Sequence, residues 1–332
     1  MASYARRLQK IGSSTLVSLP VNWVRQNHLK KGDTILMELT NDNSLAILTS
    51  QDRNEIIRGF GIDYPARVVD ILVNQLFGAY LSGYDSIRIK ARTPIDYEDR
   101  EKILTALSKL VGLEIVDEDS LNINFQFLID AGSLDAAKIL RRMNAIIKGM
   151  IRDGLNAIVN KDMKLVKLIA RRDDEIDRQY FLLVRLIRSA MLNQRIARKL
   201  DLSNIDILDY RVAASHLESA GDYVSEFSSL IPKLWGTEFE NEIVEAGMIV
   251  DGMQHRSISA FISKDDLMSE EVIRMYIKFS NLSVSIKEKS AKGSQGDPNI
   301  SILNSVYSMD QIAKCWVDIA DLVKPGYAKS QI

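Results

Sequence analysis

Residues 163–190 read MKLVKLIARRDDEIDRQYFLLVRLIRSA, and this stretch decides the fold class of the larger part of the chain. Apolar or aromatic residues recur along it at alternating spacings of three and four, which is the spacing of one helix face. That face consists of Val166, Ile169, Asp173, Ile176, Tyr180, Leu183, Ile187 and Ala190. Asp173 is its one charged member. The pattern therefore predicts a long helix with a carboxylate inside its apolar face.

The same helical spacing extends in both directions and predicts six long helices after Gly132. Helix punctuation separates several of them: Thr237 and Glu240 form a capping-box pattern, Asp297-Pro298 places a cap before proline, and Pro325-Gly326 ends the last helix. The expected helices cover residues 134–159, 163–199, 205–231, 238–262, 266–290 and 298–323. Six helices of this length form two three-helix bundles or one continuous elongated stack.

Residues 51–130 mix helical spacing with strand alternation and predict a small α/β connector domain. Residues 86–91 alternate as a strand. Residues 121–129 form the clearest strand of the sequence, which we expect to pair with residues 113–116 across an acidic turn. Two helical stripes are made by Val69, Leu72, Leu76 and Ala79, and by Ile103, Leu107 and Leu110.

Residues 1–50 alternate with a period of two and predict short strands around one short helix that begins after Pro20. Residues 34–40 and 44–48 are expected to form a hairpin around the turn at residues 41–43. So short a module buries too little apolar area to be stable alone. An identical chain or the neighbouring domains are therefore expected to complete it.

Charge is distributed unevenly along the chain. The formal net charge of the whole chain is -1, yet the first 31 residues contain six basic residues and no acid, so the remainder carries -7. A basic segment joined to a mildly acidic body indicates a polyanionic partner at the N-terminus.

Composition excludes several classes of protein. Cys315 is the only cysteine and there are three histidines, which exclude an intrachain disulfide and a Cys/His zinc cage. No apolar run approaches the roughly 20 residues that span a bilayer, and a secretion signal is lacking. We expect a cytoplasmic protein without membrane insertion.

The sequence also lacks a recognisable catalytic constellation. There is no phosphate-binding loop of the Gly-rich Lys-Ser/Thr kind, and residues 59–61 are too short for a dinucleotide fingerprint. Cys315 stands beside Trp316 on a helix patterned for packing, and His216 and Glu218 face different directions. We expect that the chain is not an enzyme.

Two acid pairs occupy consecutive predicted helices. Asp173 and Asp177 are four residues apart, and Glu218 and Asp222 repeat this spacing on the next long helix. Antiparallel neighbours bring such pairs together, and four carboxylates between helices bind a transition metal or another hard cation such as Mg²⁺. The alternative is a set of salt-bridged or hydrated structural acids, neutralised by Arg171, Arg172 or Arg211.

The N-terminal residues resemble a known family of DNA-binding modules. RRLQKIG at residues 6–12, LVSLP at residues 16–20, Trp23 and LKKGD at residues 29–33 have the order and spacing of the AbrB/MazE family. The resemblance implies a homodimer in which two chains interleave their hairpins into one small β-barrel. It departs from the family at residues 13–15, Ser-Ser-Thr, where arginine is absent.

The same resemblance implies which side chains contact DNA. Arg6 and Arg7 match the basic first strand, Arg25 matches the basic helix position, and Lys10 is a plausible addition. These side chains would lie on the phosphates of double-stranded DNA. The alternative is that the module only dimerises the protein and its arginines are solvated.

The helical part resembles the PhoU family over residues 132–326. DDEIDR at residues 173–178 and LESAGD at residues 217–222 match its acid-x-x-x-Asp signatures. The resemblance implies two tandem three-helix bundles that regulate phosphate uptake. It also implies a metal site in the first bundle, with the ligands Asp173, Asp177, Glu218 and Asp222. Lys314 stands where the second bundle should have an acid, so no metal cluster is expected there.

An AbrB-like head, an α/β middle and a PhoU-like tail together resemble archaeal phosphate-uptake regulators. The resemblance implies a multidomain transcriptional regulator of phosphate uptake, divided into residues 1–50, 51–130 and 131–332. Its implied partners are a second copy, DNA, and a phosphate ABC transporter or its signalling kinase. Two alternatives remain: an adaptor whose head only dimerises, and a metal-binding helical protein with a storage or hydrolytic role.

Overall fold

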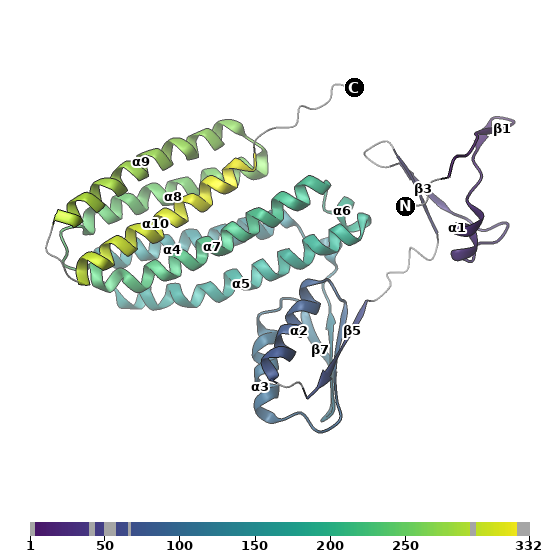
Figure 1. Ribbon diagram of the computed structural model, residues 1–332, viewed down its shortest axis with the longest axis horizontal. Coiled ribbons are helices and arrows are strands. Elements are labelled where there is room, and N and C mark those ends of the chain that lie inside the picture. The colour runs from purple at the N-terminus through teal and green to yellow at the C-terminus, as the bar shows by residue number, and fades with distance from the viewer. Residues whose placement is uncertain (1–3, 40–43, 50–57, 66–67, 293–296, 324–332) are drawn as a thin grey trace. The chain divides into compact units, whose positions relative to one another are not determined.

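The structure is a computed structural model that describes residues 4–39, 44–49, 58–65, 68–292 and 297–323 (Figure 1). The chain divides into two compact units, residues 1–57 and 58–332. The turn expected at residues 41–43 and the helix end expected at Pro325-Gly326 lie outside the described residues.

The described residues of the first unit, 4–39 and 44–49, form two hairpins and one short helix. Gly12 has φ +60° in the tight turn of the first hairpin, a conformation that glycine adopts without steric cost. The elements are β1 (Gln9–Ile11), β2 (Ser14–Leu16), α1 (Val21–Gln26), β3 (Leu36–Leu39) and β4 (Leu45–Leu48). β1 pairs with β2 and β3 with β4, both antiparallel. The hairpin and the helix after Pro20 are thus confirmed.

The swapped-hairpin barrel expected for this unit is not confirmed. In the described residues the two hairpins form separate two-stranded sheets, and they do not close into a barrel. Thr49 is the only buried residue among the side chains described in residues 4–49. The physical reason is that strands of three or four residues in one copy have too little apolar area to enclose a core.

The α/β domain, at the start of the second unit, is a four-stranded sheet with two helices against one face (Figure 1). Its elements are β5 (Gly59–Tyr64), α2 (Val69–Leu81), β6 (Ser86–Ala91), α3 (Tyr97–Ser108), β7 (Leu113–Glu118) and β8 (Asn122–Phe127). The strand order is β5-β6-β8-β7, with β5 parallel to β6 and the other pairs antiparallel. The fully buried Ile87, Ile89, Ile123 and Phe125 form its core.

The three strands and two helices expected in this segment are confirmed, but β5 was not expected. Gly59 and Gly61 are weak strand formers, so alternation alone does not reveal this strand. What makes residues 59–64 a strand is their parallel pairing with β6, which local alternation does not reveal.

Within residues 131–292 and 297–323, a 3-10 turn (Ala131–Ser133) is followed by six long α-helices and one short α-helix. They are α4 (Ala136–Asn160), α5 (Met163–Leu192), α6 (Gln194–Lys199), α7 (Asn204–Leu234), α8 (Glu240–Ser263), α9 (Asp266–Lys292) and α10 (Asp297–Asp321). Side-chain caps begin several of them: Asp135 accepts from the Lys138 N–H at α4, and Ser203 with Asp206 forms a capping box at α7.

Two helix boundaries differ from those expected. The helix expected over residues 163–199 is two helices, because the Asn193 side chain accepts from the Arg195 N–H and caps α6 as a new helix. The capping box expected from Thr237 is not formed. Its hydroxyl donates to the Leu234 carbonyl at 2.7 Å, and α8 begins at Glu240 after Phe239.

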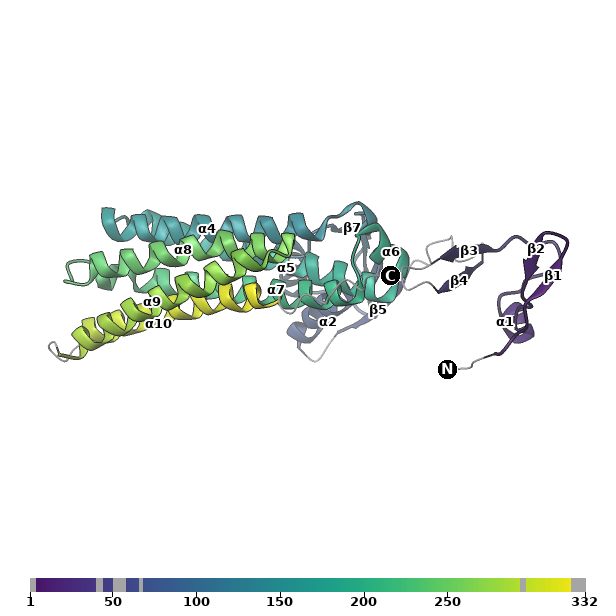
Figure 2. The ribbon, with the colours of Figure 1, turned by 90° about the horizontal axis from the view of Figure 1, so that it is seen from above.

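The long helices form two three-helix bundles that share one core. α4, α5 and α7 pack together, as do α8, α9 and α10, while α4 also packs on α8 and α7 on α10. Figure 2 shows α4 and α8 side by side. One hydrophobic cluster extends through both bundles, and it contains Trp316 and Cys315, both buried as packing residues. Each bundle therefore has its own three helices, but one hydrophobic core extends through both bundles.

Candidate functional site

The first bundle brings both acid pairs to the contact between α5 and α7. Asp173 and Asp177 belong to α5, and Glu218 and Asp222 belong to α7. A Cβ atom on Gly221 would lie 2.6 Å from Ile176 Cδ1 and 3.6 Å from Asp173 Oδ1. The glycine in LESAGD therefore permits the close approach that places the acids of α7 beside those of α5.

The acids of this site affect one another's protonation. Burial, and then the charges of Asp222 and Asp177, raise the pKa of Asp173 to about 6. Burial followed by the charges of Asp222 and Asp177 also raises the pKa of Glu218. Burial and then Asp177 raise the pKa of Asp222. Burial is thus the first cause of all three shifts, and the repulsion between the acids adds to it.

The cation nearest these acids comes from the α/β domain. Lys109, the residue that ends α3, places its Nζ 3.0 Å from Asp174 Oδ1 and 3.5 Å from Asp177 Oδ2. Its hydrogen bond to Asp174 raises the pKa of the Lys109 ammonium, so the lysine is charged at neutral pH. Lys109 also lowers the pKa of Asp173, although burial and the other acids outweigh it.

The arginines named as alternative counter-ions of the acids have other positions. Arg172 donates to Asp153 at 2.6 Å, Arg211 donates to the Tyr180 hydroxyl at 2.9 Å, and Arg171 is exposed. Sequence reasoning missed Lys109 because it lies in another domain, where no helical spacing relates it to the acids. Only the packing of the α/β domain on α5, through α2, brings it there.

As they lie in the described residues, the four acids do not surround a single position. Across the parts of the chain that the structure describes, no group of three or more His, Cys, Asp or Glu side chains is placed to hold one. The carboxylate of Asp177 already has a positively charged partner, the Lys109 ammonium, in the position where a metal ligand would face a metal ion. A metal at Asp173, Asp177, Glu218 and Asp222 therefore stays a prediction.

In the second bundle, the acid of α10 that corresponds to the acid pairs is Asp310, and a lysine of the same helix neutralises it. Lys314 Nζ lies 2.8 Å from Asp310 Oδ2. The Tyr276 hydroxyl donates to Asp310 Oδ1 at 3.1 Å. The lysine that interrupts the acid pattern is thus the counter-ion of the acid one turn before it.

Arg185 lies on α5, a few turns after the acids, and connects this helix to the α/β domain. Its side chain is 4% exposed and donates to the carbonyls of Tyr80 and Tyr84 at 2.8 and 2.9 Å. Its guanidinium carbon lies 3.8 Å from the ring centroid of Phe127. A buried charge with this many partners shows that the two domains form a defined contact. Sequence reasoning missed this residue too.

The four expected DNA-contacting residues are all exposed. Arg6 and Arg7 precede β1, Lys10 lies within β1, and Arg25 lies in the last turn of α1. Arg6 contacts its own neighbours, with its guanidinium carbon 5.6 Å from the ring centroid of Tyr4. Their positive charges are therefore available to a polyanion.

Comparison with known families finds one match. Residues 140–231 match a family model described as the PhoU domain. These residues cover most of the first bundle and include both acid pairs. Comparison with curated proteins finds no match. In the described residues, no helix is both long enough and apolar enough to cross a membrane.

Several solved chains are similar to this chain, among them two PhoU proteins. The PhoU protein from Pseudomonas aeruginosa is 18% identical with a TM-score of 0.47, over 57% of this chain and 93% of that one. The phosphate transport system regulatory protein PhoU from Streptococcus pneumoniae is 15% identical with a TM-score of 0.44, over 57% of this chain and 91% of that one.

Proposed function

We propose that this chain regulates phosphate transport, with a DNA-binding N-terminal unit that pairs with a second copy and a helical part that relays a phosphate-linked signal. The observation that carries the proposal is the PhoU-domain match at residues 140–231. The partner of the helical part would be a phosphate transporter or its signalling kinase.

Pairing of the N-terminal unit is supported by its exposed apolar side chains. Leu8 is 74% exposed, Ile11 65% and Leu39 70%. Apolar side chains on so small a unit are normally covered by a partner. A second copy carries the same apolar strands, so interleaved hairpins would bury them on both chains.

DNA contact is supported by the charge and exposure of the same unit. The first 31 residues have six basic side chains and no acid. Pairing of two copies doubles this charge on one assembly. Contacts with phosphates release counterions, so the affinity would fall steeply with added salt.

The experiment is a titration of a labelled duplex from the chain's own promoter region at low and moderate salt. The full chain is compared with an Arg6→Ala/Arg7→Ala/Arg25→Ala variant. A Lys90→Ala/Arg92→Ala/Lys138→Ala variant loses the same three charges from exposed positions of the second unit and is the control. We expect the wild type and the control to bind the duplex with an affinity that falls as salt is added. The Arg6→Ala/Arg7→Ala/Arg25→Ala variant should bind much more weakly, and its affinity should depend less on salt.

The absence of salt-sensitive binding by the wild type would exclude DNA contact and favour the second candidate, an adaptor whose N-terminal unit only dimerises. The exposed apolar side chains described above support that candidate equally well. The two functions differ only in what the exposed arginines contact.

A divalent cation at the four acids is a separate proposal, supported by the close approach of the acids and by the pKa of Asp173, which burial and then the charges of Asp222 and Asp177 raise. No step of the proposed function depends on it. Elemental analysis of the purified chain would be compared with Asp173→Ala and Glu218→Ala variants. A stoichiometric metal lost in both variants would support a metal site, and an equal trace in all three samples would exclude one.

We further propose that the chain is not an enzyme. Burial raises the pKa of the Cys315 thiol to about 12, so the only cysteine is protonated at neutral pH and unsuited to nucleophilic catalysis. Purified protein should therefore show no phosphatase or nuclease activity above that of a Glu218→Ala variant.

A further inference from the structure

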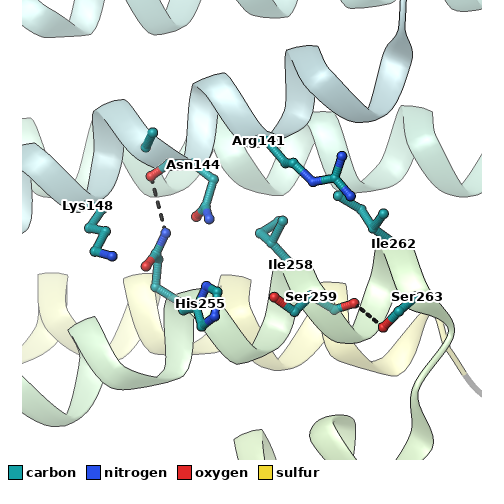
Figure 3. Close-up of a pocket in the computed structure, with 10 residues that line it drawn as sticks. Arg141, Asn144, Lys148, His255, Ile258, Ser259, Ile262 and Ser263 are labelled. Carbon is teal, nitrogen blue, oxygen red and sulfur yellow. Dashed lines mark hydrogen bonds between the residues drawn. The ribbon is translucent and has the colours of Figure 1, made fainter.

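A groove of about 400 Å³ lies between α4 and α8, where the first bundle meets the second. Figure 3 shows side chains of both helices around it, with Arg141 and Lys148 on either side of Asn144. This volume is in the range of small-molecule sites. The groove is distinct from the acid pairs, which lie between α5 and α7.

The groove is lined by two cations without a counter-ion. Neither Arg141 nor Lys148 forms an ion pair in the described part of the chain, and the residues lining the groove include no acid. The next turn of the same two helices is different, because Arg152 donates to Asp251 at 3.0 Å there. The pairing of α4 with α8 thus neutralises one cation and leaves the two in the groove available.

The middle of the groove contains buried hydrogen-bond acceptors without donors. Asn144 is 8% exposed and Gln254 is 1% exposed. Gln254 Nε2 donates to the Asn144 backbone carbonyl at 3.2 Å, which sets the orientation of its amide. Asn144 Oδ1 and Gln254 Oε1 then lack a hydrogen-bond partner in the described residues. Each of these oxygens exposes less than 1 Å², so a ligand reaches them only after the Asn144 or Gln254 side chain turns toward the groove. Unpaired buried acceptors are costly, and donors that pair with them after that rotation gain affinity.

The spacing of these groups defines the ligand they fit. Arg141 and Lys148 are seven residues apart on one helix, so a rise of 1.5 Å per residue separates their Cα atoms by about 10 Å along the axis, and their long side chains can adjust the distance between the two charges. Two anionic groups at that separation would each meet one cation. Hydroxyl groups between them would donate to the acceptors in the middle, which phosphate groups alone would not satisfy.

We propose that this groove binds a small phosphorylated polyol with phosphate groups at both ends. Arg141 binds one phosphate and Lys148 the other, while Asn144 and Gln254 accept hydrogen bonds from the hydroxyl groups. Because α4 belongs to the first bundle and α8 to the second, the bound polyol contacts both bundles. This ligand site goes beyond the proposed function and requires neither DNA binding nor dimerisation.

The test is calorimetric titration of the full chain with fructose 1,6-bisphosphate, glucose 1,6-bisphosphate and myo-inositol 1,4-bisphosphate. Inorganic phosphate and 1,6-hexanediol bisphosphate are titrated in parallel, since the first has one anionic group and the second lacks hydroxyl groups. We expect at least one polyol bisphosphate to bind about tenfold or more tightly than either comparison compound, as expected when donors satisfy buried acceptors.

The variants test the residues. Arg141→Gln/Lys148→Gln should weaken binding of that polyol bisphosphate by about tenfold or more, because two charge-assisted contacts are lost. Lys138→Gln removes an exposed charge from the same helix outside the groove and should leave binding unchanged. Thermal melting of each variant without ligand confirms that it folds.

Three results would overturn the proposal. The first is that none of the three polyol bisphosphates binds. The second is equal affinity for inorganic phosphate or hexanediol bisphosphate, which would indicate a non-selective anion site. The third is binding that the Arg141→Gln/Lys148→Gln variant retains in full.

Discussion

Asp173 is a carboxylate in an otherwise apolar helix face, and its protonation couples the stability of the first bundle to pH. Its pKa is raised from 3.8 to about 6 in the folded chain. The folded state therefore holds this proton more tightly than the unfolded state does. Between these two values the contribution of Asp173 becomes more unfavourable as pH rises, and above about 6 its cost is complete.

We predict that Asp173→Asn raises the free energy of unfolding at pH 7.5 and gives little gain at pH 4. The side chain is only partly buried, so the expected gain at pH 7.5 is about 1 kcal/mol after allowance for solvent screening. Urea denaturation at pH 4, 5, 6 and 7.5 measures it. Glu101→Gln, at an exposed position of α3 away from the acids, is the control. A gain that does not change with pH would contradict the prediction.

Arg185 stabilises the contact of α5 with the α/β domain, because it is a buried cation whose hydrogen bonds go to backbone carbonyls of that domain. Arg185→Met should lower the free energy of unfolding by about 3 kcal/mol, since it leaves those carbonyls without a donor. Arg185→Lys should recover only part, because an ammonium lacks the planar fork and stacks poorly on Phe127.

The control for Arg185 is Arg188→Met. Arg188 lies about one turn further along α5, and its side chain is exposed. It should change the free energy of unfolding by no more than about 0.5 kcal/mol. Equal effects of the two methionine variants in urea denaturation would show that the contacts of Arg185 add no stability.

At the scale of elements, the approach of α5 to α7 depends on Gly221. A Cβ atom there would overlap Ile176 Cδ1 at 2.6 Å, and Ile176 is itself buried. Gly221→Ala should therefore lower the free energy of unfolding by about 1–3 kcal/mol, despite the better helix propensity of alanine.

Gly78→Ala is the matched control for this element contact. Gly78 lies within α2, and nothing lies within 4 Å of where its Cβ would be. Alanine there should raise the free energy of unfolding by about 0.5–1 kcal/mol through helix propensity alone. Opposite signs for the two substitutions in urea denaturation would support the packing role of Gly221, and the same sign would contradict it.

At the scale of the whole molecule, we predict that the chain is a dimer through its N-terminal unit. Leu8→Asp/Ile11→Asp places charges on two apolar side chains that are 74% and 65% exposed in one copy. Because a charge buried in an apolar interface is costly, the variant should be monomeric. Gln9→Asp, on the same strand at a polar position, should remain dimeric.

Sedimentation equilibrium of the full chain at several concentrations measures this difference. Thermal unfolding of the second unit should be the same in wild type and both variants, since the substitutions lie outside it. A monomeric wild type, or a dimer that persists in the double variant, would contradict pairing through β1.

Local patterns in the sequence determined much of the second unit. The spacing of three and four along residues 163–190 depends only on helix geometry, so it predicted α5 before any contact was known. Alternation predicted β6 and β8 in the same way. It missed β5, whose Gly59 and Gly61 carry no strand signal and whose partner is more than twenty residues away.

The acid pairs were also visible in the sequence, because i, i+4 spacing is local, but their surroundings were not. Lys109 reaches Asp174 and Asp177 from another domain, and Arg185 reaches carbonyls about a hundred residues earlier. The groove between α4 and α8 likewise depends on which turns of two helices face each other. Side-chain periodicity determines which face of a helix is buried, whereas tertiary packing alone decides which distant charges that face meets.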